Sequence, residues 1–252
     1  MTRRLPALPA LLALSLVLVP GTAAAAPAVV GGVNADQPYP FAVSLHSTSG
    51  KLFCAGALIA PTWVVTAAHC AFGKAPADIS LRMGTNDSGQ GGEVAQPAEI
   101  VVNPAFNTQS PAGDIALLRL TTPATAAPIG LATAASPGTA TRILGWGQTC
   151  PKVNCGELPT TLQQLDTQIV EGTKCTSVFD GTAELCTDNP GGKSGACFGD
   201  SGGPEVVRDG DHWQLAGVTS RPGNNDPQCA TAPSIYTSVV AYAPWIAEKT
   251  KA

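Results

Sequence analysis

The chain has 252 residues, of which 44 % are apolar and 13 % charged, so it can bury a substantial core and is not a disordered chain. Its formal net charge of −4 gives it no general electrostatic attraction for nucleic acid or for an anionic membrane surface. The length suits one large domain or two small lobes.

The N-terminal segment, residues 1–28, is predicted to be a secretory signal peptide. Two arginines precede an apolar run over residues 5–19, and Ala26-Pro27-Ala28 places small residues where a signal peptidase cuts. The run is short for a membrane span, although an uncleaved anchor is the alternative. We therefore expect a secreted, extracellular protein that is not held in a membrane, with its folded domain over residues 29–252.

After this segment, short apolar stretches separated by turn residues predict β-strands, in the pattern of an antiparallel sandwich or barrel. One helix is expected over residues 240–249, where Tyr242, Trp245 and Ile246 share a face. The Ala-, Thr- and Pro-rich stretch 121–140 is either a linker between two barrel halves or a surface loop. The expected strands are 41–45, 52–59, 63–66, 79–83, 100–102, 115–120, 142–146, 164–170, 205–207, 213–219 and 234–239.

The chain contains eight cysteines, all after the signal segment. An even number in an exported chain indicates disulfides rather than redox chemistry, although the sequence alone leaves about 105 pairings open. Cys150 and Cys155 lie close together, but no second close pair accompanies them, so zinc is a weak alternative. We expect no metal and no cofactor.

Three separated segments carry residue types suited to nucleophilic catalysis. In Gly199-Asp200-Ser201-Gly202-Gly203, a serine between glycines can sit on a sharp turn with its hydroxyl exposed, although such a segment can also be a plain turn. His69 follows an apolar strand and precedes Cys70, a setting that the other two histidines lack. Asp114 opens another strand. A serine needs a base, and the base needs a partner that holds its tautomer, so the three belong together chemically.

These segments resemble the chymotrypsin/trypsin family, in which the chain order is also His, Asp, Ser. The resemblance covers nearly the whole of residues 29–252. It implies an all-β fold of two perpendicular six-stranded antiparallel β-barrels, about residues 29–125 and 126–252, with a C-terminal helix and the site between them. The matching motifs are Thr66–Cys70, Asp114–Leu117 and Gly199–Pro204, supported by Val29–Gly32, Tyr39-Pro40, Gly145–Gly147 and Tyr242–Ile246.

The resemblance implies a serine endopeptidase that works through an acyl-enzyme. Ser201 would attack the carbonyl carbon, His69 would take the serine proton, and Asp114 would hold the imidazole. The N–H groups of Gly199 and Ser201 would form the oxyanion hole. The implied disulfides are Cys54–Cys70, Cys150–Cys155, Cys175–Cys186 and Cys197–Cys229.

Activation in this family depends on a freed N-terminal amine, which here would be the amine of Val29 paired with Asp200. No Lys or Arg directly precedes Val29. Signal cleavage after Ala28 would therefore release the active terminus without a separate zymogen, whereas a cut after Ala24 or Ala26 would leave a very short propeptide.

The resemblance also places the S1 pocket, which lacks the Asp of trypsin-like members. Arg221 and Pro222 stand where the family usually has an aromatic residue and Gly, and Pro222 has no N–H for an extended substrate. We expect small or medium neutral side chains at the cut; basic specificity through Asp188 or Asp226 is the alternative. The residues expected to bind substrate are Ser194, Gly195, Ala196, Ser220, Arg221, Pro222 and Ser234.

Two other functions stay open on the sequence. An esterase of the α/β-hydrolase class shares Gly-x-Ser-x-Gly but needs its His well after the Ser, and only His212 follows. The other function is that of a non-catalytic binding protein on the same fold, which stays open because Arg221-Pro222 departs from the family pattern. The expected partners are protein or peptide substrates and protein protease inhibitors, with no nucleic acid and no membrane, and the chain is expected to be a monomer.

Overall fold

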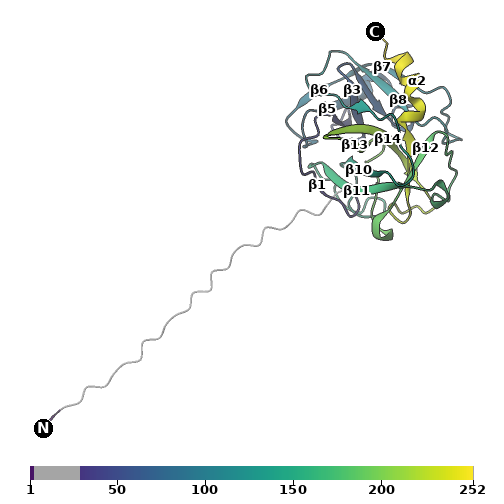
Figure 1. The fold of residues 1–252 in the computed structure, drawn as a ribbon. Coiled ribbons are helices and arrows are strands. Elements are labelled where there is room, and N and C mark those ends of the chain that lie inside the picture. The colour runs from purple at the N-terminus through teal and green to yellow at the C-terminus, as the bar shows by residue number, and fades with distance from the viewer. Residues whose placement is uncertain (3–28, 252) are drawn as a thin grey trace.

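The computed structural model of the chain describes Met1, Thr2 and residues 29–251. The expected signal peptide therefore lies, apart from its first two residues, outside the described residues. From residue 29 on, the chain forms two sheets, followed by a C-terminal helix. Figure 1 shows the first sheet in blue to teal and, apart from β1 near the N-terminus, the second in green to yellow, packed side by side.

The first sheet has seven strands in the order β6-β5-β2-β3-β4-β8-β7, all antiparallel to their neighbours. Its outermost strands, β6 and β7, are separated in the chain by Gln96 alone, so the sheet curls back toward its own start. The strands are β2 (Ala42–Ser47), β3 (Leu52–Ala60), β4 (Trp63–Thr66), β5 (Ile79–Met83), β6 (Glu93–Ala95), β7 (Pro97–Val102) and β8 (Ala116–Leu120).

The second sheet closes on itself. Its order is β1-β11-β10-β13-β14-β15-β12, and a further pairing of β11 with β12 completes a ring of six strands, with β1 and the parallel strand β9 attached outside it. The strands are β1 (Val33–Asn34), β9 (Gly130–Leu131), β10 (Ala140–Gly145), β11 (Gln163–Val170), β12 (Glu184–Thr187), β13 (Pro204–Asp209), β14 (His212–Pro222) and β15 (Ser234–Ser238).

One hydrophobic core joins the two sheets. It contains most of the buried side chains of the first sheet together with Leu144, Trp146, Leu215 and Val218 of the second half. The C-terminal helix α2 (Val239–Lys249) lies on the outside of the fold (Figure 1) and contributes Val239 and Ile246 to the same core. Its first turn is capped by the hydroxyl of Ser238, which accepts from Ala241 N.

The expected fold class is confirmed: the domain is mainly β, with two curled antiparallel sheets and a C-terminal helix. The expected strands 63–66 and 79–83 have the same bounds in the structure. The strands that the sequence did not predict are β1, β6, β9 and β12, which have two to four residues each. Such short segments are too brief for a period-two pattern to show.

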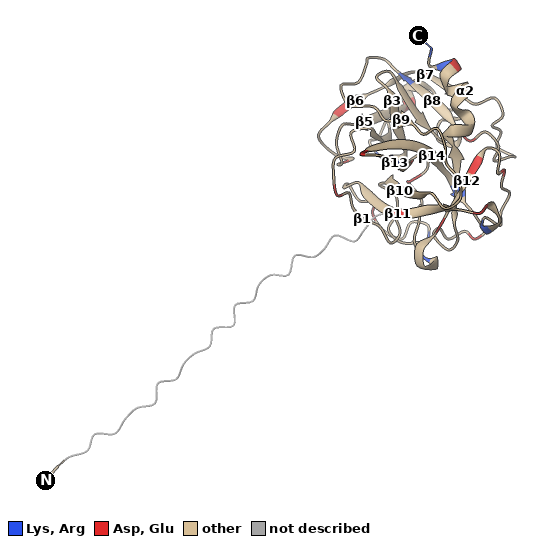
Figure 2. Ribbon diagram, viewed as in Figure 1, with Lys and Arg blue, Asp and Glu red and all other residues tan. Residues whose placement is uncertain are grey.

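Four disulfides join the same pairs of cysteines that the resemblance implied. The charged side chains are few, and Figure 2 shows them scattered over the ribbon. Among the described residues, no helix combines the length and the apolar character needed to cross a membrane.

Candidate active site

His69 and Asp114 are brought together by the pairing of β4 with β8. Thr66, the last residue of β4, lies opposite Ala116 of β8, so the residues just beyond these strand ends meet. His69 then sits on the single helical turn α1 (Ala68–Ala71). The carboxylate of Asp114 accepts two hydrogen bonds from His69, from the backbone N at 2.9 Å and from Nδ1 at 2.8 Å.

Asp114 is only 4 % exposed, but both oxygens of its carboxylate accept hydrogen bonds. Ser220 Oγ donates to the same Oδ2 atom at 2.6 Å. Burial opposes ionisation of Asp114, but the hydrogen bonds from His69 and Ser220 outweigh it and hold the pKa of Asp114 below its ordinary value. The ionised carboxylate fixes the proton of His69 on Nδ1. His69 Nε2 is left without a hydrogen-bond partner in the described part of the chain.

The loop carrying Ser201 packs against the residues that precede His69. Ala55 N donates to the carbonyl oxygen of Ser201 at 2.8 Å. Gly202 has a φ of +77°, and a side chain there would collide with Thr66 Oγ1 and the carbonyl of Ala55. The Cys197–Cys229 disulfide joins this loop to the segment around residue 229. The structure forms no hydrogen bond between Ser201 Oγ and His69.

Two backbone donors beside Ser201 are free. Within the described residues, neither Gly199 N nor Ser201 N has a hydrogen-bond acceptor, whereas the neighbouring Asp200 N donates to Cys197 O at 3.0 Å. Gly199 has a φ of +101°, and a side chain there would approach Gly147 Cα to 3.0 Å. A pair of unbonded N–H groups on one turn is suited to an anionic oxygen.

Asp200 is a buried acid directly behind this turn. It is 1 % exposed and accepts N–H bonds from Gly147 at 2.7 Å and from Cys197 at 2.8 Å. Its carboxylate leaves no room for a side chain at Gly145 or Gly147, which explains that motif. Burial raises the pKa of Asp200 to about 7, against the effect of the two N–H bonds.

Val29 and Val30 lie inside the domain. Val29 is 1 % exposed and packs in the apolar cluster of the second sheet that includes Ile143 and Ala196. The carbonyl of Val30 accepts from Gly195 N at 2.9 Å. The start of the expected mature chain is thus held against the segment that leads to Ser201; pairing of a Val29 amine with Asp200 stays a prediction.

A cavity of about 220 Å³ opens beside Ser201. Five of the seven residues expected to bind substrate line it: Ala196, Ser220, Arg221, Pro222 and Ser234. The other two do not. A side chain at Gly195 would meet Ser234 Oγ at 3.5 Å, so this glycine lies just behind the wall, while Ser194 packs against Gly31. None of the lining residues is acidic.

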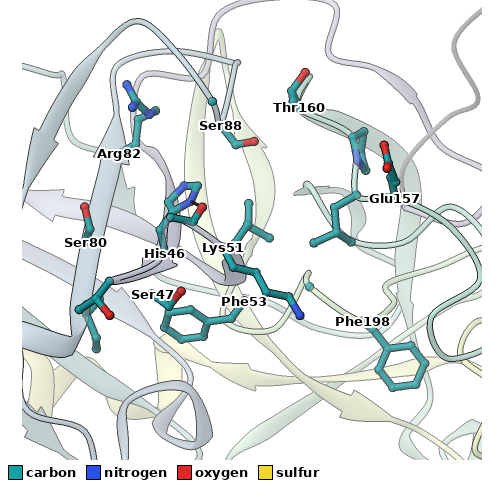
Figure 3. Close-up of a pocket in the computed structure, with 18 of the residues that line it drawn as sticks. His46, Ser47, Lys51, Phe53, Ser80, Arg82, Ser88, Glu157, Thr160 and Phe198 are labelled. Carbon is teal, nitrogen blue, oxygen red and sulfur yellow. Dashed lines mark hydrogen bonds between the residues drawn. The ribbon is translucent and has the colours of Figure 1, made fainter.

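A larger groove, of about 1100 Å³, meets the cavity at Phe198, which lines both. It runs past Gly199 and between β3, β5 and the segment around Glu157. Figure 3 shows the amine of Lys51 directed into the space between Phe53 and Phe198, with Arg82 and Glu157 farther along the walls.

The Trypsin family model matches residues 29–246 of this chain. The chain belongs to the trypsin family of serine proteases. It is similar to a trypsin of Saccharopolyspora erythraea, with 37 % identity over 229 residues, 85 % of this chain and 94 % of that protein. It is also 35 % identical to a trypsin of Sus scrofa over 86 % of this chain and 94 % of that protein, and 34 % identical to trypsin theta of Drosophila melanogaster over 86 % and 84 %.

Within the trypsin family, Arg221 and Pro222 are the departures singled out by the sequence. The guanidinium of Arg221 forms a bidentate pair with Glu184, Nη1 to Oε1 at 2.7 Å and Nη2 to Oε2 at 2.9 Å. Pro222 has no N–H to offer, and its carbonyl already accepts from Ser177 Oγ at 3.3 Å. Pro222 itself therefore has little left for a peptide backbone to pair with.

Sequence reasoning missed three residues of this trypsin-family site. Phe198 lies between Cys197 and Gly199 and is 40 % exposed. The sequence could have indicated it, because it is an apolar residue within an otherwise polar motif. Glu184 and Ser177 lie 37 and 45 residues from their partners, Arg221 and Pro222, and no local pattern links them.

Proposed function

We propose that this chain is a secreted serine endopeptidase that hydrolyses peptide bonds with His69, Asp114 and Ser201 as its triad. The observation that supports it most is the doubly hydrogen-bonded His69–Asp114 pair beside a serine turn with two free N–H groups. A triad is recognised by such geometry rather than by sequence position. The lack of a hydrogen bond between Ser201 Oγ and His69 does not count against the proposal, because catalytic hydrogen bonds often form only when substrate binds.

The proposed reaction has two halves. Ser201 Oγ forms a bond to the scissile carbonyl carbon while its proton passes to His69 Nε2, and the N–H groups of Gly199 and Ser201 bind the oxyanion. The C–N bond then breaks as His69 returns the proton to the leaving amine, which leaves an ester on Ser201. Water, deprotonated by His69, hydrolyses that ester and frees the acid product.

Trypsin-like proteases act on proteins or peptides, and we propose such substrates here, with protein inhibitors as further partners and a monomer as the active form. Four disulfides support an extracellular protein, since they persist in oxidising compartments. We also keep the expected signal peptide and the division into two barrels near residue 125 as proposals.

At the cut we propose a small or medium neutral side chain. The cavity beside Ser201 holds about 220 Å³ and has no acidic lining residue. Asp188 and Asp226, the acids that could support basic specificity, do not line it. Cleavage-site profiling with a peptide library, beside a Ser201→Ala control, tests the function and this preference together. Dominant cleavage after Arg or Lys would reject the preference but not the reaction.

Retaining Ala28 in front of Val29 is expected to lower activity by about two to three orders of magnitude, because it blocks the amine proposed to pair with Asp200 and leaves that buried acid without a cation. Protein beginning at Val29 and protein beginning at Ala28 are compared by kcat/KM. N-terminal sequencing of active secreted material provides the complementary check: a start other than Val29 would contradict direct activation by the signal cut.

A pH dependence follows for the form that retains Ala28. The pKa of Asp200, about 7 when folded, exceeds its unfolded value of about 3.9. The folded state therefore holds the proton longer, and the free energy of unfolding falls as pH rises from about 4 to about 7. Burial also raises the pKa of Glu205 to about 7. Comparison with Asp200→Asn, by denaturant unfolding at several pH values, isolates the contribution of Asp200.

In the form that begins at Val29, the pH dependence of stability is expected to come from the Val29 amine. Pairing with Asp200 raises the pKa of the amine above its unfolded value of about 8. Its contribution is therefore complete below about pH 8 and is lost as pH rises through the folded value. Activity is therefore expected to decline in alkali as the ion pair is lost. An activity plateau extending through strong alkali would contradict the ion pair.

Replacing Pro222 with alanine is expected to raise kcat/KM about fivefold for peptides with three or more residues before the cut. The change restores an N–H where an extended substrate would pair, and one neutral hydrogen bond is worth about 1 kcal/mol. Substrates with a single residue before the cut serve as the control and should show no gain. An equal gain for both substrate lengths would show that pocket shape, not backbone pairing, is responsible.

A further inference from the structure

Arg221 is held rigidly at the wall of the active-site cavity. Its side chain is 20 % exposed and its partner Glu184 only 5 % exposed. Besides the bidentate pair with Glu184, Nη2 donates to the carbonyl of Val178 at 2.6 Å. A guanidinium fixed by two carboxylate oxygens and one carbonyl has little rotational freedom, so its remaining N–H directions are set by the fold.

One of these remaining N–H groups, on Nη1, points to Ser220. Arg221 Nη1 lies 3.2 Å from Ser220 Oγ, and Ser220 Oγ lies 2.6 Å from Asp114 Oδ2. Ser220 stands at an irregularity in the pairing of β14 with β15, between Thr219 and Arg221. A continuous series of hydrogen bonds thus runs from Glu184 through Arg221 and Ser220 to Asp114 and His69.

The proton directions in this series follow from the groups themselves. A guanidinium only donates, so Ser220 Oγ must accept from Arg221. A hydroxyl has a single proton, and with Arg221 occupying one acceptor direction that proton is directed to Asp114, which is ionised and only accepts. The contact with a cationic donor also makes the Ser220 hydroxyl a stronger donor.

We propose that Arg221 is a positioning residue of the triad: it fixes the Ser220 hydroxyl as a donor to Asp114 and thereby holds the carboxylate that orients His69. The proposal rests on the proposed function, since it needs His69 to act as the base. Arg221 would thus act through Ser220 rather than by binding the substrate, and Glu184 would serve to hold Arg221 in place.

A double-mutant cycle between Arg221→Met and Ser220→Ala tests this assignment, because it measures whether the two residues act through each other. The cycle is measured with Glu184 intact and again with Glu184→Gln, which still offers Arg221 an acceptor and leaves no unpaired buried charge when Arg221 is replaced. We expect Arg221→Met to lower kcat about fivefold with little change in KM when Ser220 is present, and to have no further effect when Ser220 is alanine. Arg221→Lys, which retains a cationic donor, is expected to recover part of the loss.

Equal losses from Arg221→Met with and without the Ser220 hydroxyl would overturn the assignment, as would a loss confined to KM, because either result means that Arg221 acts directly on the substrate or on stability alone. Thermal unfolding of each variant checks that the domain is folded. Failure of the proposed function itself is recognised separately, since the Glu184→Gln parent and the unaltered chain would then both lack peptidase activity.

Discussion

Replacing Ser201 with alanine is expected to lower kcat for peptide hydrolysis by about a millionfold. The change removes the oxygen proposed to form the acyl-enzyme while leaving the turn intact, because Gly199, Gly202 and the Cys197–Cys229 disulfide determine its backbone. A residual acceleration of about 10³ to 10⁴ over the uncatalysed reaction should persist, since the two free N–H groups and the binding cavity remain.

The control for this change is Ser136→Ala, an exposed serine in the loop between β9 and β10 of the second sheet. It should retain the activity of the unaltered chain. Active-site titration of the Ser201→Ala preparation measures any contaminating unaltered enzyme, whose activity is subtracted because a trace of it would hide most of the effect. A Ser201→Ala protein within tenfold of the parent would show that another group is the nucleophile.

Replacing Asp114 with asparagine is expected to lower kcat about ten-thousandfold near neutral pH. The carboxylate accepts from His69 N, His69 Nδ1 and Ser220 Oγ, and an amide cannot accept at its nitrogen. His69 would then turn an unprotonated Nδ1 toward the amide and carry its proton on Nε2, where the base must be free. The effect should therefore be a loss of kcat rather than a rise in KM.

A pH dependence of stability accompanies this change. The pKa of Asp114 lies below its ordinary value, so its contribution to folding is present above about pH 3.9 and is lost as pH falls through the folded pKa. Asp114→Asn should remove that acid-side dependence, whereas Asp211→Asn, at an exposed turn, should not. A loss of activity of less than tenfold for Asp114→Asn would contradict its role.

The candidate triad could be predicted from short motifs alone. His69, Asp114 and the Ser201 turn each lie in a segment whose residue types are constrained locally, by a strand end, a disulfide and glycines. The structure brings His69 and Asp114 together through the register of β4 and β8. The disulfide pairs followed from the resemblance and not from cysteine spacing, which left every pairing open.

The sequence was insufficient where structure depends on contacts between distant segments. The Glu184–Arg221 pair joins residues 37 apart, and Glu184 lies on β12, a four-residue strand that no alternation revealed. The sequence accordingly predicted Arg221 as a substrate-binding residue in place of the usual aromatic one, and not as a partner of Glu184. Likewise, the break at Gln96 separates β6, which pairs with β5, from β7, which pairs with β8 at the other end of the first sheet, and only tertiary packing determines these partners.

The most direct measurement of the central claim is titration of the chain beginning at Val29 with an organophosphate, which reacts with a serine only when a neighbouring base activates it. We expect one equivalent to bind at Ser201, peptidase activity to fall in proportion to labelling, and a His69→Ala protein to take up none. Labelling at another residue, or a correctly processed and folded protein that is neither labelled nor able to cleave any peptide, would contradict the account.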